Sequence, residues 1–191
     1  TCDCQNLFDF NHVKEHIVYK LIRRDANEEL LKQIPYESFL DLAVVYYIQI
    51  DNTRFGSAAI QIRNEHLRYW RVEKEEIRRL AEKNTPRIYP VQIRQIVRFM
   101  YVATNEQCSL GAAVMRYPDF REKVRGMIRG DFYILPSSIH EVILVPESFG
   151  LEPERMQEMV KEINQTGVTP EEVLSDSVYY FDGEEIRIVA K

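Results

Sequence analysis

Cysteine is scarce in this chain. Three cysteines among 191 residues cannot form the dense disulfide framework of small secreted domains, and 29% of the residues carry a charge. This excludes the disulfide-rich secreted class and predicts a cytoplasmic protein. Hydrophobic residues make up 45% of the chain, which is enough for a buried core.

Long apolar runs and familiar catalytic motifs are also missing. The longest apolar stretch, residues 40–50, is interrupted by Asp41 and Gln49 and has about half of the ~20 residues of a membrane helix, so no membrane segment is expected. No phosphate loop, nucleophile elbow or metalloprotease helix is present. The chain starts at Thr1 without a signal peptide, which predicts that the upstream region of a longer protein is absent.

Predicted strands and helices follow one another without regular order. Because a steady β-α-β alternation is lacking, the pattern predicts an α+β fold with a mixed, mainly antiparallel sheet and several packed helices. We expect an opening segment, residues 1–9, followed by a single α+β domain, residues 10–191. Pro86 and Pro90 break the pattern, so a subdomain boundary near residues 86–100 is an alternative.

Apolar spacing and turn residues predict the individual elements. Residues 13–22 fit either a helix or an edge strand, and their period does not separate the two. Asp25 is a candidate N-cap for a helix over residues 26–33. Strands are expected at 40–50, 57–62, 101–104, 132–135, 139–145, 178–181 and 184–189, with turns at 51–56 and at Asp182-Gly183, and helices at 64–70, 73–84, 91–100, 118–128 and 153–164.

The segment from Leu135 to Pro146 holds the chain's main catalytic candidate. Ser138 and His140 are two residues apart, so in an extended strand they share one face and could form a nucleophile and base pair. Glu141 would project from the opposite face, so a carboxylate would have to come from elsewhere, such as Asp176 or Asp41.

A structural interpretation of the same residues is favoured. The segment has no elbow glycine and no identifiable oxyanion hole, so the serines would bond turn backbone groups and His140 would be a partly buried, satisfied side chain. With only residues 136–138 between two strands, the simplest hairpin register places Leu135 opposite Ile139 and Tyr133 opposite Glu141.

The sequence offers two weaker candidate sites, a Cys and His set and an arginine-rich segment. Cys2, Cys4, His12 and His16 are zinc-ligand types, but one residue between the cysteines is too few for a zinc knuckle, so no zinc and no cofactor are expected. Residues 63–98 hold ten Lys and Arg against five Asp and Glu, with Trp70 among them, which suggests weak single-stranded nucleic-acid binding as an alternative. Local ion pairs with the interleaved glutamates make nucleic-acid binding the less favoured interpretation.

Six stretches together resemble a known family. They are residues 40–46 (Leu-Asp-Leu-Ala-Val-Val-Tyr), 81–85 (Ala-Glu-Lys-Asn-Thr), 101–105 (Tyr-Val-Ala-Thr-Asn), 111–113 (Gly-Ala-Ala), 135–141 (Leu-Pro-Ser-Ser-Ile-His-Glu) and 174–179 (Leu-Ser-Asp-Ser-Val-Tyr). The chain resembles, from about Phe10 to Phe181, an uncharacterised family of anaerobic Gram-positive gut bacteria, classed as a domain of unknown function. The resemblance implies a cytoplasmic bacterial protein with a further N-terminal region, and it implies no activity.

These observations favour a non-catalytic cytoplasmic module that binds another macromolecule or its own N-terminal region. A hydrolase that uses Ser138 and His140 is the alternative from the enzyme class. The apolar face of residues 156–163 is expected to pack into the core, although an oligomer would use the same face.

Overall fold

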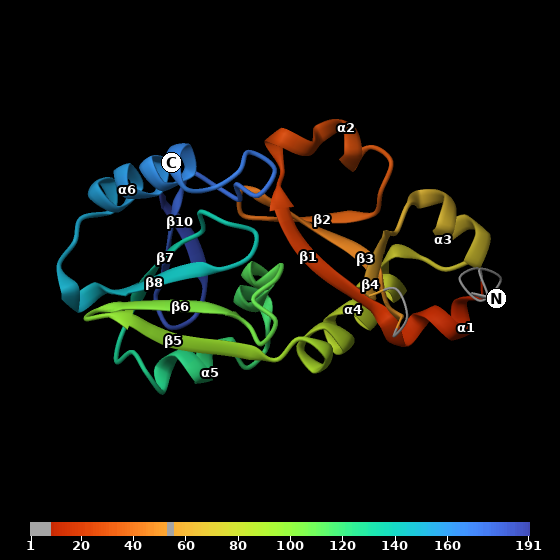
Figure 1. Ribbon diagram of the computed structural model, residues 1–191, viewed down its shortest axis with the longest axis horizontal. Helices are drawn as coiled ribbons and strands as arrows, with labels where there is room; N and C mark the ends of the chain where they lie inside the picture. Colours follow the sequence, from red (N-terminus) through yellow and green to blue (C-terminus); the bar gives the residue numbers. More distant parts are fainter. Residues whose placement is uncertain (1–8, 53–55) are drawn as a thin grey trace.

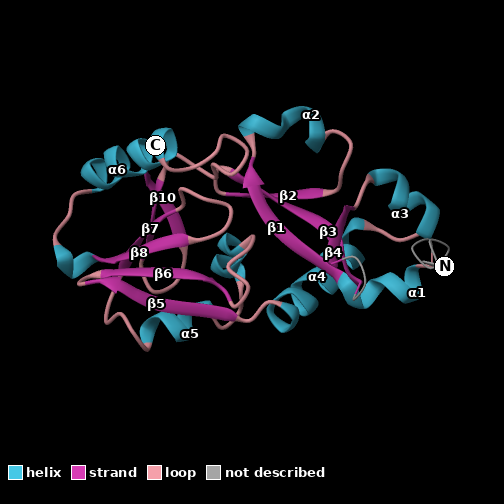
Figure 2. Ribbon diagram, viewed as in Figure 1, coloured by secondary structure: helices cyan, strands magenta, loops and turns pink. Residues whose placement is uncertain are grey.

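Two antiparallel sheets lie side by side in the computed structural model, which describes residues 9–52 and 56–191 (Figure 1). The first sheet has the order β1-β3-β2, and β4 pairs with the C-terminal half of β3. The second has the order β10-β9-β7-β8-β6-β5. Helices lie around both sheets (Figure 2), so the predicted α+β class is confirmed.

The strands of the first sheet are β1 (Ile17–Arg23), β2 (Tyr36–Phe39), β3 (Leu42–Asn52) and β4 (Gly56–Gln61). The second sheet contains β5 (Val91–Val97), β6 (Met100–Asn105), β7 (Phe132–Leu135), β8 (Val142–Pro146), β9 (Val178–Phe181) and β10 (Ile186–Ala190). The α-helices are α1 (Phe10–Val13), α2 (Glu28–Leu31), α3 (Asn64–Trp70), α4 (Lys74–Ile88), α5 (Phe120–Arg125) and α6 (Pro153–Thr166). Short 3-10 helices are η2 (Lys14–His16), η3 (Asp25–Asn27), η4 (Gly111–Arg116) and η5 (Glu147–Phe149).

The central strand of the first sheet was predicted correctly. β3 is bordered by β1 on one side and by β2 and β4 on the other, and its apolar residues are buried on both faces, as a central strand requires. The ambiguous residues 13–22 mostly form β1, at the edge of this sheet, because pairing with β3 supplies the backbone partners that local period could not reveal. Residues 53–55 of the predicted 51–56 turn lie outside the described part of the chain.

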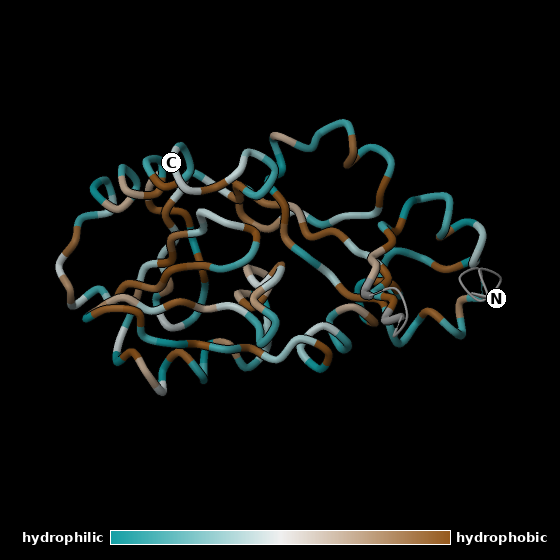
Figure 3. The backbone as a smooth tube through the Cα atoms, viewed as in Figure 1, coloured by the Kyte–Doolittle hydropathy of each residue, from teal (hydrophilic) through white to brown (hydrophobic). Residues whose placement is uncertain are grey.

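One hydrophobic cluster joins the two sheets. It contains Leu42, Val44 and Tyr46 of β3 together with Ile134 of β7 and Tyr179 of β9. The buried 3-10 helix η4 lies against both β6 and β1. In Figure 3 the strands are largely brown, whereas the chain around α2 and α3 is mostly teal. The chain crosses from one sheet to the other between the end of α4 and the start of β5.

None of the helices in the described ranges is long and apolar enough to cross a membrane.

The predicted helix over residues 91–100 is wrong. Val91–Val97 forms β5, whose partner is β6, and the hairpin turns at Arg98-Phe99. The Ile and Val residues of this segment, with arginines between them, fit the apolar face of a helix, and they fit an edge strand equally well. Pairing with β6 settles the choice through backbone hydrogen bonds that no local pattern contains.

The predicted register of the β7–β8 hairpin is also wrong, although the two strands are antiparallel neighbours. Leu135 pairs with Ile143 and Tyr133 with Val145, so the connection comprises residues 136–141 instead of three. These residues have other partners: Ser138 forms an isolated bridge with Val173, and the Ile139 N–H bonds the Glu172 carbonyl at 2.9 Å. His140 therefore lies in a loop and shares no strand face with Val142.

Two helices are shorter than predicted, and the C-terminal elements agree with their prediction. Asp25 accepts hydrogen bonds from the Arg23 guanidinium and begins η3, so α2 starts only at Glu28. The helix expected at 118–128 is α5, Phe120–Arg125. Helix α6 is confirmed, and so is the β9–β10 hairpin, although its turn comprises residues 182–185 and β10 begins at Ile186 instead of 184. Met156 and Val160 of α6 are fully buried against the second sheet.

Candidate functional site

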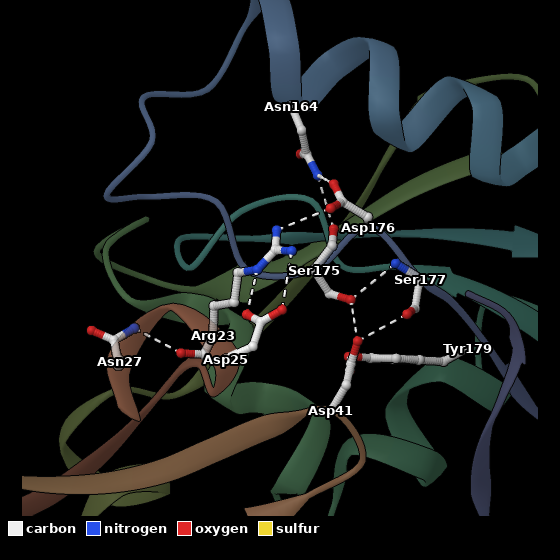
Figure 4. Close-up of polar contacts among 9 residues, drawn as sticks. All are labelled: Arg23, Asp25, Asn27, Asp41, Asn164, Ser175, Asp176, Ser177 and Tyr179. Carbon is white, nitrogen blue, oxygen red and sulfur yellow. Dashed lines mark hydrogen bonds and ion pairs between the residues drawn. The ribbon is translucent and has the colours of Figure 1, made fainter. Parts of the chain in front are cut away.

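The junction of the two sheets gathers the polar residues of most interest. Arg23 leaves the end of β1 and bonds Asp25 through Nε at 2.7 Å and Asp176 through Nη1 at 3.0 Å (Figure 4). The Asn164 amide of α6 donates to the other Asp176 oxygen at 2.8 Å and to the Ser175 carbonyl at 2.9 Å. Arg23 thus connects the first sheet to the segment that leads into β9, and its guanidinium bonds the carboxylates of Asp25 and Asp176.

Asp41 makes the second polar connection across the junction. It lies in the β2–β3 turn, and its carboxylate accepts hydrogen bonds from Ser175 Oγ at 2.6 Å and Ser177 Oγ at 2.8 Å, and a short one from the Tyr179 hydroxyl (Figure 4). The three donors are almost fully buried, at 1%, 2% and 0% exposure. Burial, together with the neighbouring Asp41 charge, raises the pKa of Tyr179, so this hydroxyl keeps its proton.

Ser138 and His140 lie near the junction but do not bond each other through their side chains. Ser138 Oγ accepts from the His140 backbone N–H at 3.1 Å, which closes a local turn. The imidazole Nδ1 accepts the Leu110 N–H at 3.1 Å, and Nε2 lies 3.1 Å from Glu172 Oε1. Because Nδ1 accepts the Leu110 N–H, Nε2 is the nitrogen that donates to Glu172.

This geometry leaves the imidazole without a nitrogen that could take a proton from Ser138. The Glu172 pKa is held below its usual range, first by the hydrogen bond from His140 and then by one from Thr169. The partner carboxylate is thus Glu172, 32 residues further along the chain, rather than Asp176 or Asp41. No sequence signal identified Glu172, because its approach depends on the bridge between Ser138 and Val173.

The loop that carries His140 packs closely against Gly111. The His140 carbonyl accepts from Gly111 N at 3.0 Å and from Thr104 Oγ1 at 2.7 Å. A Cβ atom on Gly111 would lie 2.0 Å from Thr104 Oγ1 and 2.6 Å from the His140 carbonyl oxygen. Only a residue without a side chain therefore allows η4 to approach this loop and β6 together.

Replacing Gly111 by alanine should lower the free energy of unfolding by about 3 kcal/mol, because the added methyl group forces backbone and side-chain shifts in a packed region. Urea unfolding followed by circular dichroism measures the change. Gly126→Ala is the matched control, since its φ is not positive and its nearest backbone contact would be 3.3 Å. Equal stability of the two variants would contradict this account of Gly111.

Two hollows open at the junction. The larger one, of about 760 Å³, is lined by Arg23, Lys161 and Asp176 among others. The smaller one, of about 400 Å³, has Lys20, Ile22, Leu30 and Ile139 in its wall. Both are lined by Arg23, Ala26, Pro170 and Val173, so they adjoin. Together they form one site, whose charged side chains include Lys20 and Arg23 of β1, Lys161 of α6 and Asp176 of the segment before β9.

The other candidates are placed elsewhere. Cys2 and Cys4 lie outside the described residues. His12 lies in α1 and bonds Asp9 at 2.8 Å, while His16 ends η2, so the pair does not share one continuous α-helix. Across residues 9–52 and 56–191, no three His, Cys, Asp or Glu side chains gather as they would around a metal ion.

Part of the positive charge of residues 63–98 is paired: among the described residues, Arg78, Arg79, Lys83 and Arg87 lie within 4.0 Å of a carboxylate. Arg78 bonds Glu37 and Glu82 at 3.1 and 3.2 Å, and Arg79 bonds Glu76 at 2.7 Å. The Trp70 ring packs against Phe10 and His66, with centroid distances of 5.6 and 5.4 Å. This indole is therefore committed to packing, which leaves less of it for stacking on a base.

Comparison with known proteins extends the sequence resemblance. A family of unknown function (DUF5688) matches residues 1–100 and 97–183, two segments that span nearly the whole chain. No curated protein and no solved structure matches this chain. The chain therefore belongs to this family of unknown function, DUF5688.

Proposed function

We propose that this chain is a non-catalytic binding module that takes its ligand at the junction of the two sheets. The observation that carries the proposal is the pair of adjoining hollows, of about 760 and 400 Å³, with charged groups from β1, from α6 and from the segment before β9 in their walls. Hollows of this size with a few convergent polar groups are typical of ligand sites. The family resemblance and the small number of cysteines support a module of the bacterial cytoplasm.

The arrangement around His140 supports binding over hydrolysis. A serine hydrolase needs an imidazole nitrogen free to accept the nucleophile's proton, a carboxylate that orients the ring, and donors for the oxyanion. Here the ring accepts the Leu110 N–H and bonds Glu172, while the Ser138 oxygen accepts a backbone N–H. We therefore assign Ser138 and His140 a structural role in the loop that carries Ile139, a residue that lines the smaller hollow.

The enzyme alternative has a direct test. Hydrolysis of p-nitrophenyl acetate should be equally slow for the native chain, Ser138→Ala and His140→Ala. His140→Ala alone should lower stability, by about 1 kcal/mol, because the Leu110 N–H loses its acceptor. A rate that falls at least 100-fold in Ser138→Ala would instead establish the hydrolase.

The binding site itself is tested by a fragment screen. We expect fragments that bind to shift the backbone amide resonances of residues that line the hollows, such as Ala26, Asn164 and Val173, in ¹⁵N-labelled protein. Trp70, which lies in α3 and lines neither hollow, is the internal control. A screen whose bound fragments all shift resonances outside these walls would contradict the proposed site.

A further inference from the structure

Lys20 is a cation among apolar neighbours on one sheet face. On β1 it shares this face with Val18 and Ile22, and it pairs with Val45 of β3. Val18 and Val45 are fully buried, and Tyr47, further along the same face, is 4% exposed. A side chain that served only to pack here would be aliphatic, because half-burying an ammonium costs free energy that an apolar group does not.

The ammonium has little compensation from the protein. Its Nζ lies 5.7 Å from the centre of the Tyr47 ring, a distance near the outer limit of a cation–π contact. Within the described ranges, no carboxylate lies within 4.0 Å of it, although Glu171 lines the same hollow. Burial lowers the pKa of Lys20.

The smaller hollow supplies both parts of a ligand site. Lys20 contributes a charged group to it, and Ile22, Leu30, Ile139 and Val173 contribute apolar wall. Its volume of about 400 Å³ is in the range of small-molecule sites. Glu171 is an exposed residue, which places its charge at the rim.

The neighbouring guanidinium adds no second free cation. Arg23, which lines the same hollow, already bonds Asp25 and Asp176. One available positive charge with a carboxylate at the rim suits a ligand with a single negative charge, and disfavours a phosphate dianion. The apolar walls suit a hydrocarbon body attached to that charge.

We propose that the smaller hollow binds a small monocarboxylate with an apolar body, whose carboxylate pairs with the Lys20 ammonium. This inference rests on the proposed function, because it names the ligand class for part of the same junction. A bound carboxylate provides a counter-charge beside Lys20. The hydrocarbon body replaces water against Ile22, Leu30 and Ile139.

Calorimetric titration with sodium octanoate tests the proposal. We expect saturable binding to the native chain, and an affinity at least tenfold lower for Lys20→Met and for Lys20→Gln, which both remove the charge. Glu171→Gln should bind octanoate equally or more tightly, since it removes only a rim charge. Octanol, which has the same body without the charge, should bind the native chain at least tenfold more weakly than octanoate.

Stability separates a ligand-binding lysine from a structural one. Without ligand, Lys20→Met should melt at the native temperature or above it, because methionine has similar length and carries no desolvated charge. If Lys20→Met melted several degrees lower than the native chain, the proposal would be overturned. Unchanged octanoate affinity in both Lys20 variants, or no octanoate binding to the native chain at millimolar concentration, would also overturn it. Fragments of other chemistry that still bind the junction would leave the proposed function standing in each of those cases.

Discussion

Replacement of Asp41 by alanine should lower the free energy of unfolding by about 3–5 kcal/mol, since one carboxylate satisfies three buried hydroxyls. Ser175, Ser177 and Tyr179 are buried at 2% exposure or less, so water cannot readily replace the lost acceptor. Chemical unfolding in urea, followed by both tyrosine fluorescence and circular dichroism, measures the loss.

Two further variants make this test specific to the junction. Asp25→Ala removes an exposed carboxylate bonded to Arg23 and should cost less than about 1 kcal/mol. Tyr179→Phe removes one of the three donors, so a double-mutant cycle with Asp41→Ala should show that the two losses are not additive. If Asp41→Ala were no less stable than Asp25→Ala, the carboxylate would not hold the two sheets together.

Above pH 10 the folded state should lose stability steeply. Burial raises the pKa of several tyrosine hydroxyls, and five of these tyrosines are at most 4% exposed: Tyr19, Tyr46, Tyr47, Tyr117 and Tyr179. The unfolded chain releases these protons near pH 10, while the folded chain retains them, so the unfolded state binds fewer protons and stability falls as the pH rises. Their contribution to stability is fully present below pH 10.

The expected size of this effect is large. Each buried tyrosine lowers stability by about 1.4 kcal/mol per pH unit above 10, so five together cost about 7 kcal/mol by pH 11. Domains of this size are typically stable by about 5–15 kcal/mol, so unfolding is expected between pH 11 and 12.

Spectroscopy checks the alkaline transition. Tyrosinate absorbance at 295 nm and far-ultraviolet circular dichroism should change together in one steep step, and a return to pH 8 should reverse it. Tyr47→Phe should reduce the slope of stability against pH by about one fifth, since one of the five groups is removed. Full tyrosinate absorbance at pH 10.5 with an unchanged circular dichroism spectrum would refute the prediction.

Local patterns were sufficient wherever an element's structure depends on near neighbours. β3 was predicted from its β-branched and aromatic run, the β9–β10 hairpin from Asp182-Gly183, and α6 from the spacing of Met156 and Val160. In each case, side chains a few residues apart share one face or one turn. The hydrogen bond that Ser138 Oγ accepts from the His140 N–H is local in the same way, because the two residues are only two positions apart.

The sequence by itself therefore determined the α+β class and the central strand, because short-range periodicity encodes them. Tertiary structure alone decided that 91–97 is a strand, that Leu135 pairs with Ile143, and that His140 meets Glu172. It also brought Asp41 to Tyr179, 138 residues away, and placed Lys20 Nζ 5.7 Å from the centre of the Tyr47 ring. These contacts depend on the pairing of distant backbone groups and on one core shared by two sheets, and neither leaves a repeating signal in the local order of residues.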